Sequence, residues 1–253
     1  MPDRDYPTLQ ALTMPRDPQP PLTPRACGVL LHPSSLPSRW GIGDLGSTAR
    51  DFAQRLGAAG QRYWQVLPLN PTSSAAGDSP YFSSSSQAGN PLLISLEDLA
   101  TDGLLEAGEL SPPLLSSADR VDFDLARERK LPLLHRAAER AAAGVGDVAI
   151  SADFAAFCAR EAEWLDDHAL FKALQESQQV SWLQWPEPLR RHYPTALEAA
   201  STELAAAVLR EKWLQYFFDR QWRRLHAECA AAKVWLFGDM PIYVNYDSVD
   251  VWA

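Results

Sequence analysis

The sequence lacks several features that mark whole classes of protein. Its 253 residues include only three cysteines, Cys27, Cys158 and Cys229, and their wide spacing fits neither a disulfide framework nor a metal-binding motif. Uninterrupted apolar runs such as Val234–Phe237 are only a few residues long, far short of the roughly 20 needed to cross a bilayer. The N-terminus has no apolar signal-peptide core. These absences predict a reduced, cytoplasmic protein without a membrane span.

Positive charge is also scarce. The chain has 23 Lys and Arg against 32 Asp and Glu, a formal net charge of −9, which gives no general electrostatic reason to bind nucleic acid or an anionic membrane. The hydrophobic share of 46% and the charged share of 22% are ordinary for a globular protein and exclude wholesale disorder. Nine Trp residues call for either a large core or a ligand that stacks on flat rings.

Apolar periodicity predicts an α/β fold. Met1–Arg25, with seven prolines, is typical of a disordered or loosely docked tail. Cys27–Leu31 is a short apolar strand, Ser47–Gly60 has helical spacing, and Arg62–Leu67 is the next strand. A strand–helix–strand unit of this length predicts two parallel strands.

Most of the remaining chain is predicted to be helical. After a short extended run at Leu92–Leu96, amphipathic helices are expected over Phe154–Gln178 and about Ala196–Ala232, followed by a third strand at Val234–Phe237. The predicted division is a tail over residues 1–25, a first strand–helix–strand part with a substrate loop over 26–100, a helical insertion over 101–200, and a helix with the third strand over 201–253.

Three such strands predict the N-terminal part of a (β/α)8 TIM barrel with a large helical insertion. A whole barrel takes about 250 residues without insertions, so we expect the remaining strands to lie beyond Ala253. Six strand residues are then expected to face the barrel interior without opposing strands to cover them: Val29, Leu31, Val66, Leu67, Val234 and Leu236.

Three motifs are candidates for ligand binding, and the first of them is better explained as a structural loop. Gly41-Ile-Gly43-Asp-Leu-Gly46 matches a dinucleotide pattern, but about nine residues separate it from the preceding strand, which favours a glycine loop that caps the helix at Ser47. Asp78-Ser-Pro-Tyr81 is either a turn with an aromatic plug or a sugar contact on a loop. Asp239 follows a hydrophobic strand directly, where a buried carboxylate is costly unless it binds a ligand.

The other candidate functional residues have weaker support from the sequence. Asp247 and Asp250 are interpreted as turn or N-cap residues. The five histidines form no metal-binding pair, and only His32, after the first strand, is placed for function. No nucleophile elbow or P-loop is present. The tryptophans of the helical region are expected in the core: Trp164, Trp182, Trp185, Trp213 and Trp222.

Several long motifs together resemble the 4-alpha-glucanotransferase family, also called amylomaltase or disproportionating enzyme. They cover the chain from about Ala26 to its last residue: Gly28-Val-Leu-Leu-His-Pro-Ser-Ser-Leu-Pro37, Gly41-Ile-Gly-Asp-Leu-Gly46, Trp64-Gln-Val-Leu-Pro-Leu-Asn-Pro-Thr72, Ser79-Pro-Tyr81, Ala88-Gly-Asn-Pro-Leu-Leu-Ile94, Gly238-Asp-Met-Pro-Ile-Tyr-Val244 and Asp247-Ser-Val-Asp-Val-Trp252. The loop Phe82–Gln87 departs from the commoner family pattern, with serines where bulkier residues often stand.

The resemblance implies an alpha-amylase-like barrel that needs no cofactor and moves a piece of an α-1,4-glucan to the 4-hydroxyl of another glucan. It implies that Ser79 and Tyr81 contact sugar and that Asp239 is the family's strand-end carboxylate. The nucleophilic Asp, the Glu acid/base and a second Asp come from later strands in this family, and no motif here matches them. Two alternatives stay open, an α-glucan hydrolase on the same barrel and a non-catalytic glucan-binding fragment, as does the oligomeric state.

Overall fold

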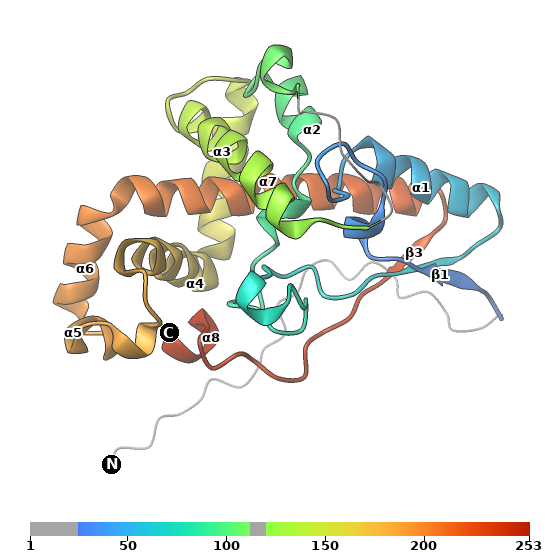
Figure 1. Cartoon of the computed structure of the whole chain (residues 1–253). Helices are drawn as coiled ribbons and strands as arrows, with labels where there is room; N and C mark the ends of the chain where they lie inside the picture. The colour runs from blue at the N-terminus through green and yellow to red at the C-terminus, as the bar shows by residue number, and fades with distance from the viewer. Residues whose placement is uncertain (1–24, 112–119) are drawn as a thin grey trace.

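The computed structural model describes residues 25–111 and 120–253. Apart from Arg25, the tail predicted over residues 1–25 lies outside this described part. Figure 1 shows a long helix, α7 (Ala205–Ala231), that runs through the molecule from a small sheet to a group of helices around the C-terminus. The fold is therefore mostly helical, with the sheet at one end.

The three predicted strands form a parallel sheet. Strands β1 (Gly28–Leu30), β2 (Tyr63–Gln65) and β3 (Trp235–Phe237) pair in the order β1-β2-β3. Val29 lies beside Trp64, and Trp64 beside Leu236. The predicted parallel pairing is confirmed, although each strand is shorter than its apolar run.

Helices α1 (Ser47–Ala58) and α7 supply the core that covers one face of this sheet. Residues alternate between the two faces of a strand, and the alternation turns five of the six supposed interior residues toward the helices: Val29, Leu31, Val66, Val234 and Leu236. The expectation that these five face an uncovered barrel interior is therefore wrong. The opposite face carries Leu30 and Phe237, which are 56% and 55% exposed.

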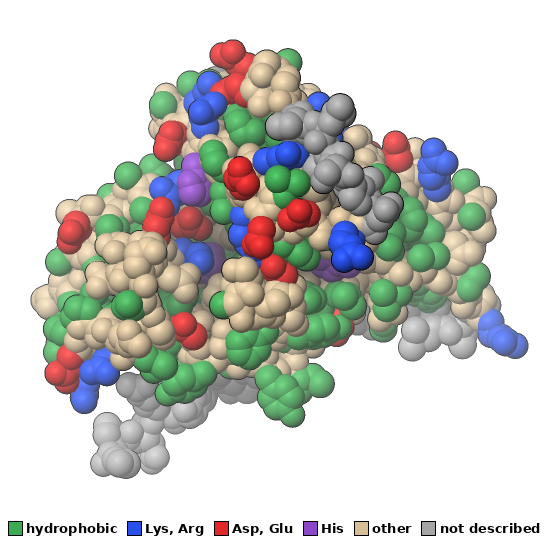
Figure 2. All heavy atoms as spheres, viewed as in Figure 1, with side chains coloured by type: hydrophobic (Ala, Val, Ile, Leu, Met, Phe, Trp, Pro, Cys, Tyr) green, Lys and Arg blue, Asp and Glu red, His purple; other side chains and the backbone are tan. Residues whose placement is uncertain are grey.

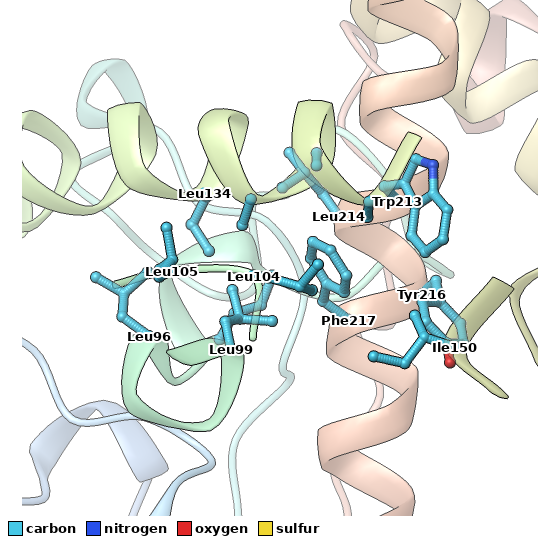
Figure 3. Close-up of a cluster of buried hydrophobic side chains, with 14 of the residues drawn as sticks. Leu96, Leu99, Leu104, Leu105, Leu134, Ile150, Trp213, Leu214, Tyr216 and Phe217 are labelled. Carbon is cyan, nitrogen blue, oxygen red and sulfur yellow. The ribbon is translucent and has the colours of Figure 1, made fainter. Parts of the chain in front are cut away.

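A second core joins α7 to three further helices, α2 (Leu96–Thr101), α3 (Phe123–Ala142) and α4 (Val148–Gln178). Figure 3 shows Leu96, Leu99 and Leu134 in one cluster with Leu214 and Phe217 of α7. Trp213 stacks on the ring of Phe154 with centroids 3.7 Å apart, so it is a core residue as predicted. Because α3 and α4 both pack on α7, the helical region and the sheet share one central helix.

Two predicted elements have different shapes. The run Leu92–Leu96 is not extended: a 3-10 helix, η3 (Pro91–Leu93), begins at a proline capped by Asn90, and Ser95 caps α2 by accepting a hydrogen bond from Asp98. The single helix predicted over Ala196–Ala232 is two helices, α6 (Pro194–Glu203) and α7, because Leu204 has a non-helical backbone between them.

The last elements form a third cluster. Helices α5 (Glu187–Arg190) and α8 (Val249–Trp252) accompany α6, and Trp185 and Trp252 are buried there against Phe171 of α4. The other 3-10 helices are η1 (Pro33–Ser35), η2 (Ser74–Ala76), η4 (Ala107–Glu109) and η5 (Trp182–Gln184).

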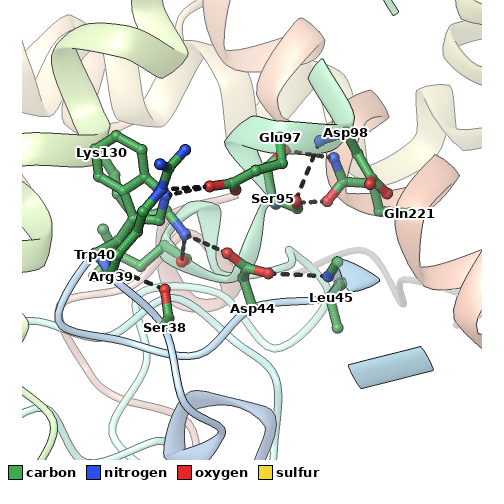
Figure 4. Close-up of polar contacts among 12 residues, drawn as sticks. Ser38, Arg39, Trp40, Asp44, Leu45, Ser95, Glu97, Asp98, Lys130 and Gln221 are labelled. Carbon is green, nitrogen blue, oxygen red and sulfur yellow. Dashed lines mark hydrogen bonds and ion pairs between the residues drawn. The ribbon is translucent and has the colours of Figure 1, made fainter. Parts of the chain in front are cut away.

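The glycine motif is a structural loop, as predicted. Gly46 is the N-cap residue of α1, and a Cβ at Gly43 would lie 2.2 Å from the carbonyl oxygen of Pro33, so the loop folds tightly on itself. Figure 4 shows Lys130 of α3 beside Asp44 of this loop, and its buried ammonium lies 3.4 Å from the Asp44 carboxylate. The same ammonium donates to the Leu92 carbonyl at 2.7 Å. Burial lowers the pKa of Lys130.

Candidate active site

The loop after β2 carries the Asp78-Ser-Pro-Tyr81 motif and is held at its base by side-chain contacts. The Asn70 amide donates to the carbonyls of Ser86 and Ala88 at 2.9 and 3.1 Å. Ser83 donates to the Pro71 carbonyl at 2.7 Å. These bonds close the loop on itself.

The structure brings the three predicted site residues together. The Tyr81 hydroxyl donates to the Asp239 carboxylate at 2.6 Å, although 158 positions separate the two residues. The Ser79 hydroxyl oxygen accepts a hydrogen bond from the Tyr81 amide at 3.4 Å, which places it in the same turn. A loop tip after β2 and the segment after β3 therefore form one polar site.

One premise about Asp239 is wrong. The carboxylate is exposed rather than buried, because β3 ends at Phe237 and Asp239 stands on an open segment beyond it. Its charge is stabilised by Tyr81 and by solvent, so its presence does not require a bound ligand. The hydrogen bond to Asp239 raises the pKa of the Tyr81 phenol, which keeps the hydroxyl protonated and able to donate.

The pair has the chemistry of a sugar contact. A phenol and a carboxylate side by side offer a donor, several acceptor positions and an aromatic face, which match the hydroxyls and the C–H face of a pyranose. Tyr81 is 45% exposed, so its ring has a free face.

A cavity of about 560 Å³ adjoins Asp239. Asn70 and Gln87 are among its polar lining residues, and its apolar walls include aromatic rings of α4 and α7: Phe157, Trp164, Phe218 and Trp222. Trp164 and Trp222 were expected in the core. They pack against it, but they are only partly buried and also line this cavity. The combination of aromatic walls and amide side chains is typical of a carbohydrate pocket.

His32 lies between the loops that follow β1 and β2. Its ring contacts the Ser34 hydroxyl at 2.7 Å and the Pro68 carbonyl at 3.3 Å. Burial lowers the pKa of His32, which favours the neutral ring. These partners give the side chain a role in joining the two loops.

Two contacts that hold the loop were missed by sequence reasoning. Asp78 forms an ion pair with Arg127 of α3. Asp250 of α8 accepts from the Ser86 amide at 2.9 Å and from its hydroxyl at 2.6 Å, so it is a loop clamp rather than a turn residue. Asp247 accepts from Ser181 at 2.9 Å, and Ser248 is the actual N-cap residue of α8. No local pattern reveals these partners, because they lie on distant segments.

Metal-binding clusters and membrane-spanning helices are both absent from residues 25–111 and 120–253. Within these ranges no group of three or more His, Cys, Asp or Glu side chains could hold a metal ion. No helix there has the length and apolar character of a bilayer span. All three cysteines are free thiols.

Comparisons with known proteins identify the family. Residues 31–253 match the family model described as 4-alpha-glucanotransferase. The chain is 46% identical over 235 residues to the 4-alpha-glucanotransferase of Thermus thermophilus and 42% identical over 235 residues to that of Synechocystis. These alignments cover 91% and 92% of this chain but only 45% and 46% of the relatives, so the chain spans less than half of their length.

Solved structures agree with the sequence comparisons. An amylomaltase from Streptococcus agalactiae in complex with acarbose superposes with a TM-score of 0.84 at 33% identity, covering 91% of this chain and 46% of that one. An amylomaltase from Corynebacterium glutamicum, at 20% identity and a TM-score of 0.66, shares the fold over 89% of this chain and 31% of its own. The resemblance of the sequence motifs is thereby confirmed, and the chain belongs to the 4-alpha-glucanotransferase family.

Proposed function

We propose that this chain supplies α-glucan contacts to a 4-alpha-glucanotransferase, in which Ser79, Tyr81 and Asp239 bind the sugar at the cleavage point. The observation that carries the proposal is the 2.6 Å hydrogen bond from Tyr81 to Asp239, which joins two family motifs into one exposed polar site. The acarbose complex of the Streptococcus agalactiae relative supports an α-glucan as the substrate.

The proposed reaction is a retaining double displacement on a (β/α)8 barrel to which β1, β2 and β3 belong. A carboxylate attacks the anomeric carbon while a carboxylic acid about 5–5.5 Å away protonates the leaving oxygen. The 4-hydroxyl of an acceptor glucan then displaces the enzyme carboxylate and gives its proton to the same acid/base residue. Tyr81 and Asp239 hold the hydroxyls of the reacting sugar during both steps.

We also propose that residues 1–253 alone do not catalyse transfer. Asp239 has Tyr81 as its hydrogen-bond partner, and no sequence motif here matches the family's nucleophile or acid/base residue. The share of the Thermus thermophilus relative that is covered, 45%, supports the same reading.

Incubation with pure maltotriose tests the function. The assay compares two proteins: the 253-residue chain, and the full-length protein translated from its complete reading frame. A transferase converts maltotriose into glucose and longer oligomers, and we expect this pattern from the full-length protein only. An α-glucan hydrolase would give only shorter sugars, and failure of both proteins to act would favour a glucan-binding fragment without activity.

The role of Asp239 is tested by Asp239→Asn in whichever of these two proteins shows transfer, which is called the active form below. The amide keeps the shape and part of the hydrogen bonding of the carboxylate, so we expect activity to fall without disappearing. A glycosyl adduct trapped on Asp239 would show that it is the nucleophile and would overturn the assignment.

A further inference from the structure

A second cavity, of about 600 Å³, lies between α3, α4 and α7 and contains none of Ser79, Tyr81 and Asp239. Thr72 and Asn90, at the two ends of the loop that carries Tyr81, line one side of it. Figure 2 shows Lys or Arg, His, and Asp or Glu side chains around a hollow between α3 and α4. The cavity falls within the range of roughly 300–1,000 Å³ that is usual for small-molecule pockets.

Three polar groups in this pocket have unused hydrogen-bonding capacity. His168 of α4 is 1% exposed, and its Nδ1 atom has no hydrogen-bond partner in the described structure. Lys172, one turn further along α4, donates to the Gln175 side chain at 2.7 Å and has further donors. The Glu211 carboxylate of α7 is buried, and its closest ion-pair contact is with Arg210 at 3.9 Å, beyond hydrogen-bond distance.

Lys172 and Glu211 interact electrostatically, but they form no hydrogen bond with each other. Burial raises the pKa of Glu211, while the positive charge of Lys172 acts in the opposite direction. Yet the described residues show no hydrogen bond or ion pair between the Lys172 ammonium and the Glu211 carboxylate within 4.0 Å. Glu211 is buried and Lys172 is partly buried. A buried carboxylate normally accepts hydrogen bonds, because desolvation without a partner is costly. A ligand hydroxyl that accepts from the Lys172 ammonium and donates to the Glu211 carboxylate would satisfy both groups.

We propose that this pocket binds a neutral, hexose-sized polyhydroxylated molecule whose hydroxyl groups bridge Lys172 and Glu211 and donate to His168. A hydroxyl both donates and accepts, so it satisfies an ammonium, a carboxylate and an imidazole nitrogen together. The opposite charges of Lys172 and Glu211 balance, and a buried carboxylate disfavours a phosphate or another anion. Leu92, Leu131 and Leu214 give the pocket apolar surface for the C–H face of a sugar ring.

The proposal does not rest on the transferase function, and equilibrium dialysis of the 253-residue chain with radiolabelled D-glucose tests it separately. We expect one glucose per chain to remain bound when the site at Tyr81 is removed by Tyr81→Ala. Lys172→Met and Glu211→Gln should each weaken binding at least about tenfold, because each removes a charged hydrogen-bonding partner. Lys212→Met is the matched control: this lysine of α7 pairs with Asp166 and does not line the pocket, so its loss should leave binding unchanged.

One further variant, Tyr81→Ala, and one competitor, inorganic phosphate, distinguish the proposed pocket from other binding sites. Tyr81→Ala should retain glucose binding, and inorganic phosphate should not compete. Binding that is lost in Tyr81→Ala and kept in both pocket variants would put the glucose at the other site and overturn the proposal. Absence of binding would show a cavity filled by water alone, and competition by phosphate would show an anion site; either result also overturns it. Circular dichroism of Glu211→Gln, the isosteric change, checks that the fold is intact.

Discussion

At the scale of single residues, the proposed sugar site depends on Tyr81 and Asp239. The phenol lies on a loop tip and the carboxylate on an open segment, so neither contributes to a packed core. Their hydrogen bond of 2.6 Å orients both groups before any sugar arrives. Preorganised donors of this kind contribute more to the transition state than to folding.

Tyr81→Phe should therefore lower kcat/KM with little effect on stability. Loss of one oriented donor at a reacting centre reduces the rate by roughly 10²–10³-fold. Tyr193→Phe is the matched control, because Tyr193 is 46% exposed against 45% for Tyr81 and lies outside the site. Steady-state kinetics in the active form of the protein measures the effect, and an unchanged kcat/KM would remove Tyr81 from the site.

His168 gives a second prediction at this scale, on pH. Burial lowers its pKa to about 3, whereas an unfolded histidine titrates near 6.5. Between these values the unfolded chain binds the extra proton, so this histidine makes the fold less stable as pH falls below about 6.5. We expect His168→Gln to flatten the loss of unfolding free energy by up to about 1.4 kcal/mol per pH unit in that window. Urea titrations between pH 6.5 and 4.5 measure it, and parallel pH profiles for both proteins would contradict it.

At the scale of elements, the structure depends on α7. Two of its glutamines each bind a backbone segment through both amide atoms: Gln215 accepts from the Gly89 amide and donates to its carbonyl, and Gln221 does the same with Ser95. The segment between Gly89 and Ser95 includes η3 and leads into α2. Helix α7 therefore fixes the end of the site loop as well as the core.

Gln221→Leu tests this arrangement. The change leaves the Ser95 amide buried without its acceptor, whereas the Ser95 carbonyl still accepts from the Leu99 amide. An unsatisfied buried group costs about 1–3 kcal/mol, so we expect a loss of that size in unfolding free energy. Gln54→Leu on the exposed face of α1 is the control. A loss within about 0.5 kcal/mol of the Gln54→Leu control, the usual scatter of surface substitutions, would contradict this role of Gln221.

The same scale shows what the sequence can and cannot predict. The strands and α1 follow from local apolar periodicity, so they were predicted nearly in place. The break at Leu204 was missed because it interrupts an unbroken helical pattern without a glycine or proline. The face presented by Val29 and Val66 depends on where distant helices pack, and the clamp between Ser86 and Asp250 joins positions 164 residues apart. Neither leaves a local signal.

At the scale of the whole molecule, β3 and the segment that follows it carry six of the exposed large hydrophobic side chains of the described residues. Strands β1 and β3 are the edges of the described sheet, and several large apolar side chains on β3 and the segment after it are open to solvent: Phe237, Met240, Ile242, Tyr243, Val244 and Tyr246. Unpaired strand edges beside an apolar patch favour association between chains.

We therefore expect the 253-residue chain to self-associate as its concentration rises. Met240 and Ile242 are 81% and 90% exposed, so Met240→Ser combined with Ile242→Ser should reduce association without loss of packing. Sedimentation velocity over a concentration series measures it. A wild-type chain that stays monomeric throughout would contradict the expectation.

The central claim, that Ser79, Tyr81 and Asp239 form the sugar site, is tested most directly by a crystal structure of the active form with bound maltotetraose. We expect glucose hydroxyls within hydrogen-bond distance, about 2.5–3.2 Å, of the Tyr81 hydroxyl and the Asp239 carboxylate. An ordered oligosaccharide elsewhere, with the bond between Tyr81 and Asp239 intact and no sugar beside it, would contradict the claim.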